Sequence, residues 1–171
     1  LGAPVAREAR AHLPRGGPVS EGTALLQQLW ELALSSRWFS GRSGRPVDVE
    51  LGPWAGPTLR PAALVVEFDD GHRERFHVPL LYRDGAPTDA CDEGGVLLRA
   101  LHADAPGFER YRAVAPNLPA RRYAGEQSNT SVFFGDELLV KVFRRLEPGR
   151  SVDVELHAAL AGSGTVAELY G

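Results

Sequence analysis

The chain has 171 residues, of which 43% are hydrophobic and 24% are charged, and this is the composition of a globular protein rather than a disordered one. Its formal net charge of −3 excludes a strongly basic binder of nucleic acid or lipid headgroups. Apolar runs such as residues 64–66 are far shorter than a membrane span, and the single Cys91 fits a reducing compartment, so we expect no membrane partner and a cytoplasmic location.

Lysine is conspicuously rare in this sequence. The 19 Lys and Arg residues include one lysine, Lys141, so the other 18 are arginines. Met and Ile are absent while Ala, Gly, Pro and Arg are abundant, which is typical of a GC-rich, bacterial coding sequence. A drift from Lys to Arg is resisted where a guanidinium cannot replace an ammonium group. Lys141 is therefore either functional or the last lysine by chance.

The first half of the chain predicts a helix followed by an antiparallel sheet. Residues 1–19 show no periodicity and no secretory signal, and without Met at position 1 we expect a poorly ordered lead-in to a processed or partial chain. Apolar residues at helical spacing predict a helix over 23–35. Alternating residues predict strands at 47–51, 64–68 and 76–80, with a turn at Asp70-Gly71. Residues 20–84 should form a first subdomain.

The second half predicts a further mixture of helix and sheet over residues 85–171. Turn-forming residues at 83–95 suggest a boundary, a short helix is expected over 96–103, and residues 106–119 should be loop. Three strands are predicted at 121–125, 130–134 and 138–144. Ser151 can cap a helix over 152–161. The expected fold class is therefore α+β.

The last predicted helix places a carboxylate among its apolar residues. The apolar residues recur at helical spacing and should face the sheet: Val152, Leu156, Ala159 and Leu160. Glu155 falls in the same stripe, and an inward carboxylate needs a partner. The nearest cation on the preceding strand is Lys141, which alternates with Val140 and Val142, so we predict a Lys141–Glu155 ion pair. The pair is either structural or part of a functional site.

A polar loop precedes the strand that carries Lys141. Residues 125–131 are rich in Ser, Asn and Thr, and such a hairpin tip exposes N–H groups and hydroxyls that can hold phosphate oxygens. Taken alone, it can equally be a plain hydrophilic turn. The order of polar loop, lysine strand and glutamate helix is that of the nucleotide-binding half of protein-kinase-like phosphotransferases.

Two sequence blocks carry a resemblance to a known family. Residues 125–136 (GEQSNTSVFFGD) and 139–149 (LVKVFRRLEPG) resemble the N-terminal lobe of bacterial maltokinases and the related actinobacterial glucosamine kinases, which are aminoglycoside-phosphotransferase-like enzymes. Residues 37–42 (RWFSGR) are similar to the start of that family's N-terminal cap subdomain. The resemblance implies a cap at 20–84 and a kinase-like N-lobe at 85–171.

The resemblance also implies site residues and cofactors. The phosphate-covering loop would consist of Gln127, Ser128, Asn129, Thr130 and Ser131. Lys141 would bind the phosphates of ATP, and Glu155 would hold Lys141. The catalytic base and the Mg²⁺ ligands would lie in a C-terminal lobe, so this chain should contain no catalytic residue and be inactive alone. The acceptor stays open between maltose and an amino sugar, because Ser151-Val152 stand where the maltokinase pattern has Asn-Pro.

Other candidate sites are weaker. His102 and Asp104 imitate a kinase His-x-Asp motif but precede Lys141, so we interpret the spacing as accidental. His72 and His77 lack further metal ligands and should lie on the surface, and Cys91 has no neighbour that would mark a nucleophile. The alternative function is a non-catalytic kinase-like module whose cap docks a sugar-metabolism partner, such as an enzyme of the trehalose or glycogen pathway.

Overall fold

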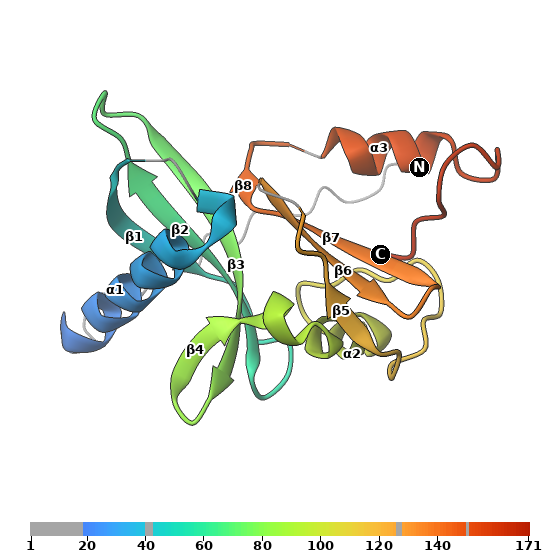
Figure 1. The fold of residues 1–171 in the computed structure, drawn as a ribbon, viewed down its shortest axis with the longest axis horizontal. Coiled ribbons are helices and arrows are strands. Elements are labelled where there is room, and N and C mark those ends of the chain that lie inside the picture. The colour runs from blue at the N-terminus through green and yellow to red at the C-terminus, as the bar shows by residue number, and fades with distance from the viewer. Residues whose placement is uncertain (1–18, 40–42, 126–127, 150) are drawn as a thin grey trace, which may run out of the picture.

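The computed structural model describes residues 19–39, 43–125, 128–149 and 151–171. Its described helices are α1 (Val19–Ser35), α2 (Gly95–His102) and α3 (Val152–Ala159), with short 3-10 helices η1 (Arg37–Phe39) and η2 (Ala90–Glu93). Together with two antiparallel sheets they form an α+β fold, as predicted (Figure 1). The predicted lead-in lies outside the described residues, apart from Val19.

The first sheet is covered by helix α1. Its strands β1 (Arg45–Leu51), β2 (Leu59–Glu67), β3 (Arg73–Arg83) and β4 (Ala86–Asp89) lie in that order. The apolar side of α1 buries Leu29 and Ala33 in the same core as Leu64 and Phe76 from the sheet, as helical and alternating spacing predict. Leu34, whose spacing along the helix predicts the same side, is 57% exposed.

Two tight turns shape this sheet. Asp70-Gly71 joins β2 to β3 as predicted, with Gly71 at a φ of 84° that favours glycine. Asp84-Gly85 joins β3 to β4, and both residues have positive φ, 48° and 82°, as a type I′ hairpin requires. Residues 83–95, predicted as a boundary stretch, therefore continue the first sheet and then form η2.

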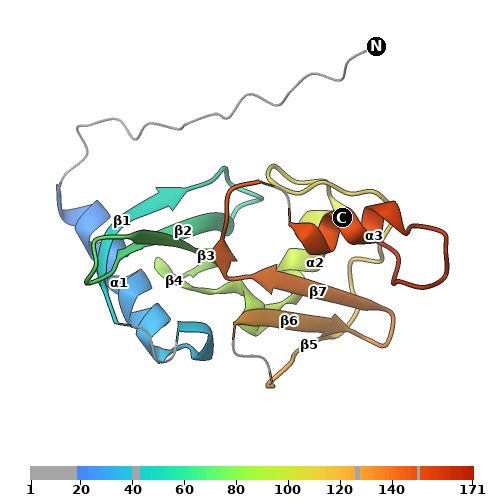
Figure 2. The same cartoon turned by 90° about the horizontal axis from the view of Figure 1, so that it is seen from above.

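The second sheet contains β5 (Ala120–Arg122), β6 (Asn129–Phe134) and β7 (Leu138–Phe143), in that order. Helices α2 and α3 lie on opposite sides of it (Figures 1 and 2). Leu98 of α2 and Val132 and Phe134 of β6 are fully buried in one core. Gly94 lies so close to β6 that a Cβ there would collide with the Val132 side chain.

The C-terminal half returns to the first sheet. Strand β8 (Arg145–Leu146) pairs with Arg75 and Phe76 of β3, on the edge that β4 occupies further along β3. Leu59 and Leu81 of the first sheet are in turn buried in the core of the second. Strands from both sides of the predicted 84/85 boundary thus share one sheet, and the boundary itself falls within the β3–β4 turn.

Candidate functional site

The predicted phosphate loop covers the end of the β5–β6 connection and the first three residues of β6. Gln127 is outside the described residues, whereas Ser128 is exposed and Asn129, the first residue of β6, is half-buried. Thr130 and Ser131 are each only 3% exposed. The Thr130 hydroxyl accepts a hydrogen bond from Nε of Arg144 at 2.9 Å. Among the described loop residues, Ser128 and Asn129 are therefore the side chains open to a ligand.

Lys141 lies on the more exposed face of β7, which it shares with Leu139 and Phe143 as predicted. It stands directly across from Ser131 in the β6–β7 register. Its side chain is 38% exposed, and Nζ lies 5.0 Å from the centre of the Phe143 ring. The ammonium group is thus held at the sheet surface rather than buried.

The partner of Lys141 is Asp153, and the predicted pairing with Glu155 is wrong. Nζ of Lys141 donates to Oδ2 of Asp153 at 2.7 Å. This hydrogen bond, together with the charge of Lys141, holds the pKa of the Asp153 carboxyl below its ordinary value. Glu155 is exposed. Lys141 is therefore paired with a carboxylate of the expected helix, Asp153, which lies two residues before the predicted Glu155 in the first turn.

Helix α3 does not bury its apolar stripe. Val152 is 77% exposed and Leu156 is 51% exposed, and no residue of α3 is buried. Helical spacing predicts which residues share a side, but the direction of that side depends on the connection from β7. Ser151 is the N-cap residue of α3, as predicted, but its side chain makes no capping hydrogen bond. Its backbone carbonyl accepts from the Glu155 N–H.

A buried arginine at the junction of the two sheets escaped the sequence analysis. Arg144 is 0% exposed and its Nη2 lies 2.5 Å from Oδ2 of Asp89, which is 3% exposed. Its guanidinium also donates to the His77 carbonyl at 3.3 Å and lies 5.1 Å from the Trp38 ring centre. Residues of β3, β4, β6 and η1 therefore all contact this side chain. The sequence gives it no distinguishing signal, since it is one of two adjacent arginines after a strand that already contains Lys141.

The remaining candidates have structural surroundings. His72 is exposed beside Asp70, whereas His77, predicted on the surface, is half-buried on β3, where its backbone groups bond with Arg144. Loss of solvation and the nearby Arg144 charge lower the pKa of His77 to about 4. Burial raises the pKa of the Cys91 thiol to about 12, so this cysteine is not an activated nucleophile.

His102 and Asp104 make structural contacts with the segment that follows α2. Nδ1 of His102 lies 2.7 Å from the Val114 carbonyl oxygen, and the Asp104 carboxylate accepts from the Arg110 N–H at 3.2 Å. Among the described residues, no three His, Cys, Asp or Glu side chains gather as a metal site. Of the helices in the described ranges, none has the length and apolarity needed to cross a bilayer.

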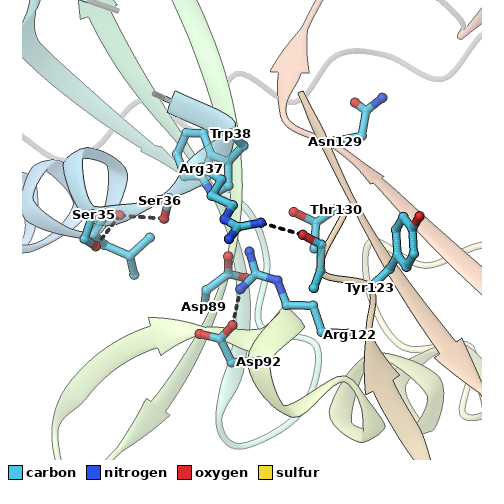
Figure 3. A pocket seen from close by; sticks show the side chains of 12 residues that line it. Ser35, Ser36, Arg37, Trp38, Asp89, Asp92, Arg122, Tyr123, Asn129 and Thr130 are labelled. Carbon is cyan, nitrogen blue, oxygen red and sulfur yellow. Dashed lines mark hydrogen bonds and ion pairs between the residues drawn. The ribbon is translucent and has the colours of Figure 1, made fainter. Parts of the chain in front are cut away.

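A cleft of about 420 Å³ opens between the two sheets, beside the predicted phosphate loop. Its walls come from the end of α1, η1, η2, β5 and the start of β6. Figure 3 shows Arg37 and Arg122 directed into this space, with Asp89 and Asp92 across from them. Nη1 of Arg37 donates to the Ala124 carbonyl at 2.6 Å. We refer to this space as the junction cleft.

Comparison with known protein families adds no assignment. A scan of the sequence against family models finds no match. The kinase resemblance of residues 125–149 therefore stays a prediction.

Proposed function

We propose that this chain is the nucleotide-binding part of an ATP-dependent sugar kinase, with maltose or glucosamine as the acceptor class. The observation that carries the proposal is the pairing of the lone lysine. Lys141 projects from the exposed face of β7, across from Ser131, and is held at 2.7 Å by a carboxylate of the following helix. A kinase positions its phosphate-binding lysine through such a strand-to-helix ion pair.

The residues available for ATP form a small set. Lys141 would contact the phosphates, Asp153 would hold it in place, and Ser128, Asn129 and the backbone N–H groups of the loop would cover the phosphate oxygens. ATP supplies the phosphoryl group for transfer, and Mg²⁺ offsets its charge. By the family resemblance, the base and the Mg²⁺ ligands would be contributed by a C-terminal lobe.

Calorimetric titration of this chain with ATP tests the phosphate-binding role. We expect wild-type protein to bind ATP and Lys141→Met to bind at least about tenfold more weakly, because a charge-assisted phosphate contact is lost. Arg145→Met is the matched control, since Arg145 is another half-exposed cation, paired with Glu74. Unchanged binding by Lys141→Met, or no binding by the wild type, would contradict the proposal.

The reading frame downstream of Gly171 tests the catalytic part. About two hundred further residues with a His-x-Asp and a following Asn or Asp would complete a kinase, and its product should consume ATP only when sugar is present. The 171-residue chain alone should not. Sugar-dependent ATP consumption by the pure chain, or a stop codon soon after Gly171, would overturn this assignment.

One observation favours a binding module as the second candidate. Trp54 is 44% exposed beside β2, with Arg60 and Tyr82 each 5.2 Å from its ring centre. Trp, Tyr and Arg are the residues that most often dominate protein interfaces. An enzyme of trehalose or glycogen metabolism would then dock here, and Trp54→Ala should abolish its co-elution with this chain in gel filtration. Co-elution that survives this substitution would contradict a docking role for the surface around Trp54.

A further inference from the structure

The junction cleft has the features of a binding site that is separate from Lys141. Its volume of about 420 Å³ falls within the range of small-molecule pockets. Lys141 is absent from its lining, which comes instead from α1, η1, η2 and the β5–β6 pair. A ligand here would thus lie between the two sheets rather than on the exposed face of β7.

The described charges that surround the cleft do not balance. Arg122 forms an ion pair with Asp92, and the buried Asp89 forms an ion pair with Arg144. Arg37 is bound by a neutral group, the Ala124 carbonyl, at 2.6 Å. Three guanidinium groups therefore meet two carboxylates among these described residues, which leaves one excess positive charge. Guanidinium groups bind phosphate oxygens through paired N–H donors.

The rest of the lining provides acceptors and an aromatic surface. The hydroxyls of Ser35 and Ser36 both donate to the Leu32 carbonyl, at 2.9 Å and 2.6 Å, so their oxygens remain acceptors. Tyr123 is 46% exposed at the same cleft. Hydroxyl groups of a polyol need acceptors of this kind, and its C–H face can lie against an aromatic ring.

An inner wall of the cleft also contains an unsatisfied donor. Trp38 lines the cleft and is 4% exposed, and among the described residues no acceptor lies within hydrogen-bond distance of its buried Nε1–H. A buried donor without an acceptor is costly. This atom has no accessible surface in the cleft, so it would contact a ligand only after a shift of the indole ring.

We propose that the junction cleft binds a small phosphorylated polyol of the sugar-phosphate class, with its phosphoryl group on Arg37 and Arg122. The hydroxyls would donate to the serine oxygens and to Asp92. Because Arg37 also holds the carbonyl of Ala124, a bound phosphate would compete for this guanidinium at the start of the predicted phosphate loop. That effect on the loop rests on the proposed kinase function, whereas binding itself does not.

Titration of ¹⁵N-labelled chain with glucose 6-phosphate, inorganic phosphate and glucose tests the proposal. We expect the sugar phosphate to shift the Ala124 and Asn129 amide signals in a saturable manner, phosphate to bind more weakly, and glucose not to bind. Arg122→Ala and Arg37→Ala should each weaken binding about tenfold or more, and Arg122→Lys by less, because it retains the charge without the paired donors.

Arg121→Ala is the matched control, since Arg121 is the neighbouring exposed residue of β5 and lies over the Phe133 ring at 4.9 Å rather than in the cleft. It should bind as the wild type does. Lys141→Met should also keep sugar-phosphate binding while losing ATP, so failure of the kinase proposal and failure of this one give different results. Equal loss in Arg121→Ala and Arg122→Ala, or no saturation, would overturn the assignment.

Discussion

Two cations three residues apart, Lys141 within β7 and Arg144 directly after it, lie in opposite surroundings. Lys141 is 38% exposed, at the sheet surface beneath α3, a helix that buries no residue. Arg144 is 0% exposed, at the junction where β3, β4, β6 and η1 meet. The sequence draws attention to the lysine because it is unique, whereas the arginine, one of 18, is the residue that contacts strands of both sheets.

The difference separates a region suited to binding from one suited to holding the fold together. An exposed ion pair contributes little to stability and can exchange its partner for a ligand. A buried pair leaves an uncompensated charge when one member is removed, so it cannot exchange freely. Substitutions in the two regions should therefore differ in size and in the property that they change.

The largest effect is expected at the junction. Arg144→Met should lower the free energy of unfolding by about 3–5 kcal/mol, because the carboxylate of Asp89 would remain buried without its partner. Denaturant-induced unfolding followed by fluorescence measures this directly. The double variant Arg144→Met/Asp89→Asn is the control, and it should recover part of the loss because no buried charge remains. A loss below about 1 kcal/mol in the single variant would contradict a central role for Arg144.

A second, smaller effect concerns acid stability. His77 has a pKa of about 4 in the folded chain, below its ordinary 6.5, because burial and Arg144 disfavour its protonated form. The unfolded chain therefore takes up this proton first as the pH falls. The contribution of neutral His77 is complete above pH 6.5 and is lost between pH 6.5 and 4, amounting to about 3 kcal/mol.

The substitution His77→Gln isolates this contribution. The backbone groups of residue 77 that bond with Arg144 are retained in this variant. The free energy of unfolding should decline less steeply from pH 7 to pH 4 in the variant than in the wild type. The exposed carboxylates titrate alike in both proteins, so the difference reports on His77. Parallel profiles would mean that folding does not lower the pKa of His77.

The parts of this fold that could be predicted are those in which one side of an element is buried. The stripe of α1 that contains Leu29 and Ala33, and the alternation of Phe76 and Val78 with His77 in β3, indicate helix and strand because burial imposes the period. The exposed side of β7 around Lys141 followed from the same alternation.

The parts that could not be predicted depend on relations between elements. Spacing places Val152 and Leu156 on one side of α3, yet both are exposed, because no local pattern states which side turns toward the sheet. The return of β8 to β3 and the burial of Arg144 likewise arise from pairing between distant segments. The hairpin at Asp84-Gly85 differs from these, since its Asp-Gly dipeptide is itself a local hairpin signal within a stretch rich in turn-forming residues.

The smallest expected effect lies at α3, and it tests which carboxylate belongs to Lys141. Because Lys141 lowers the pKa of Asp153, the stability from this pair is present above the ordinary value of 3.8 and is lost as the pH falls through the folded pKa. In an NMR titration, Lys141→Met should raise the pKa of the Asp153 carboxyl, whereas Glu155→Gln should leave it unchanged and alter stability by no more than about 0.5 kcal/mol. If Glu155→Gln raised the pKa of Asp153 instead, Glu155 would also interact with Lys141. Asp153→Asn and Glu155→Gln would then need to be compared for ATP binding, because the residue that orients Lys141 is the one whose loss should weaken it.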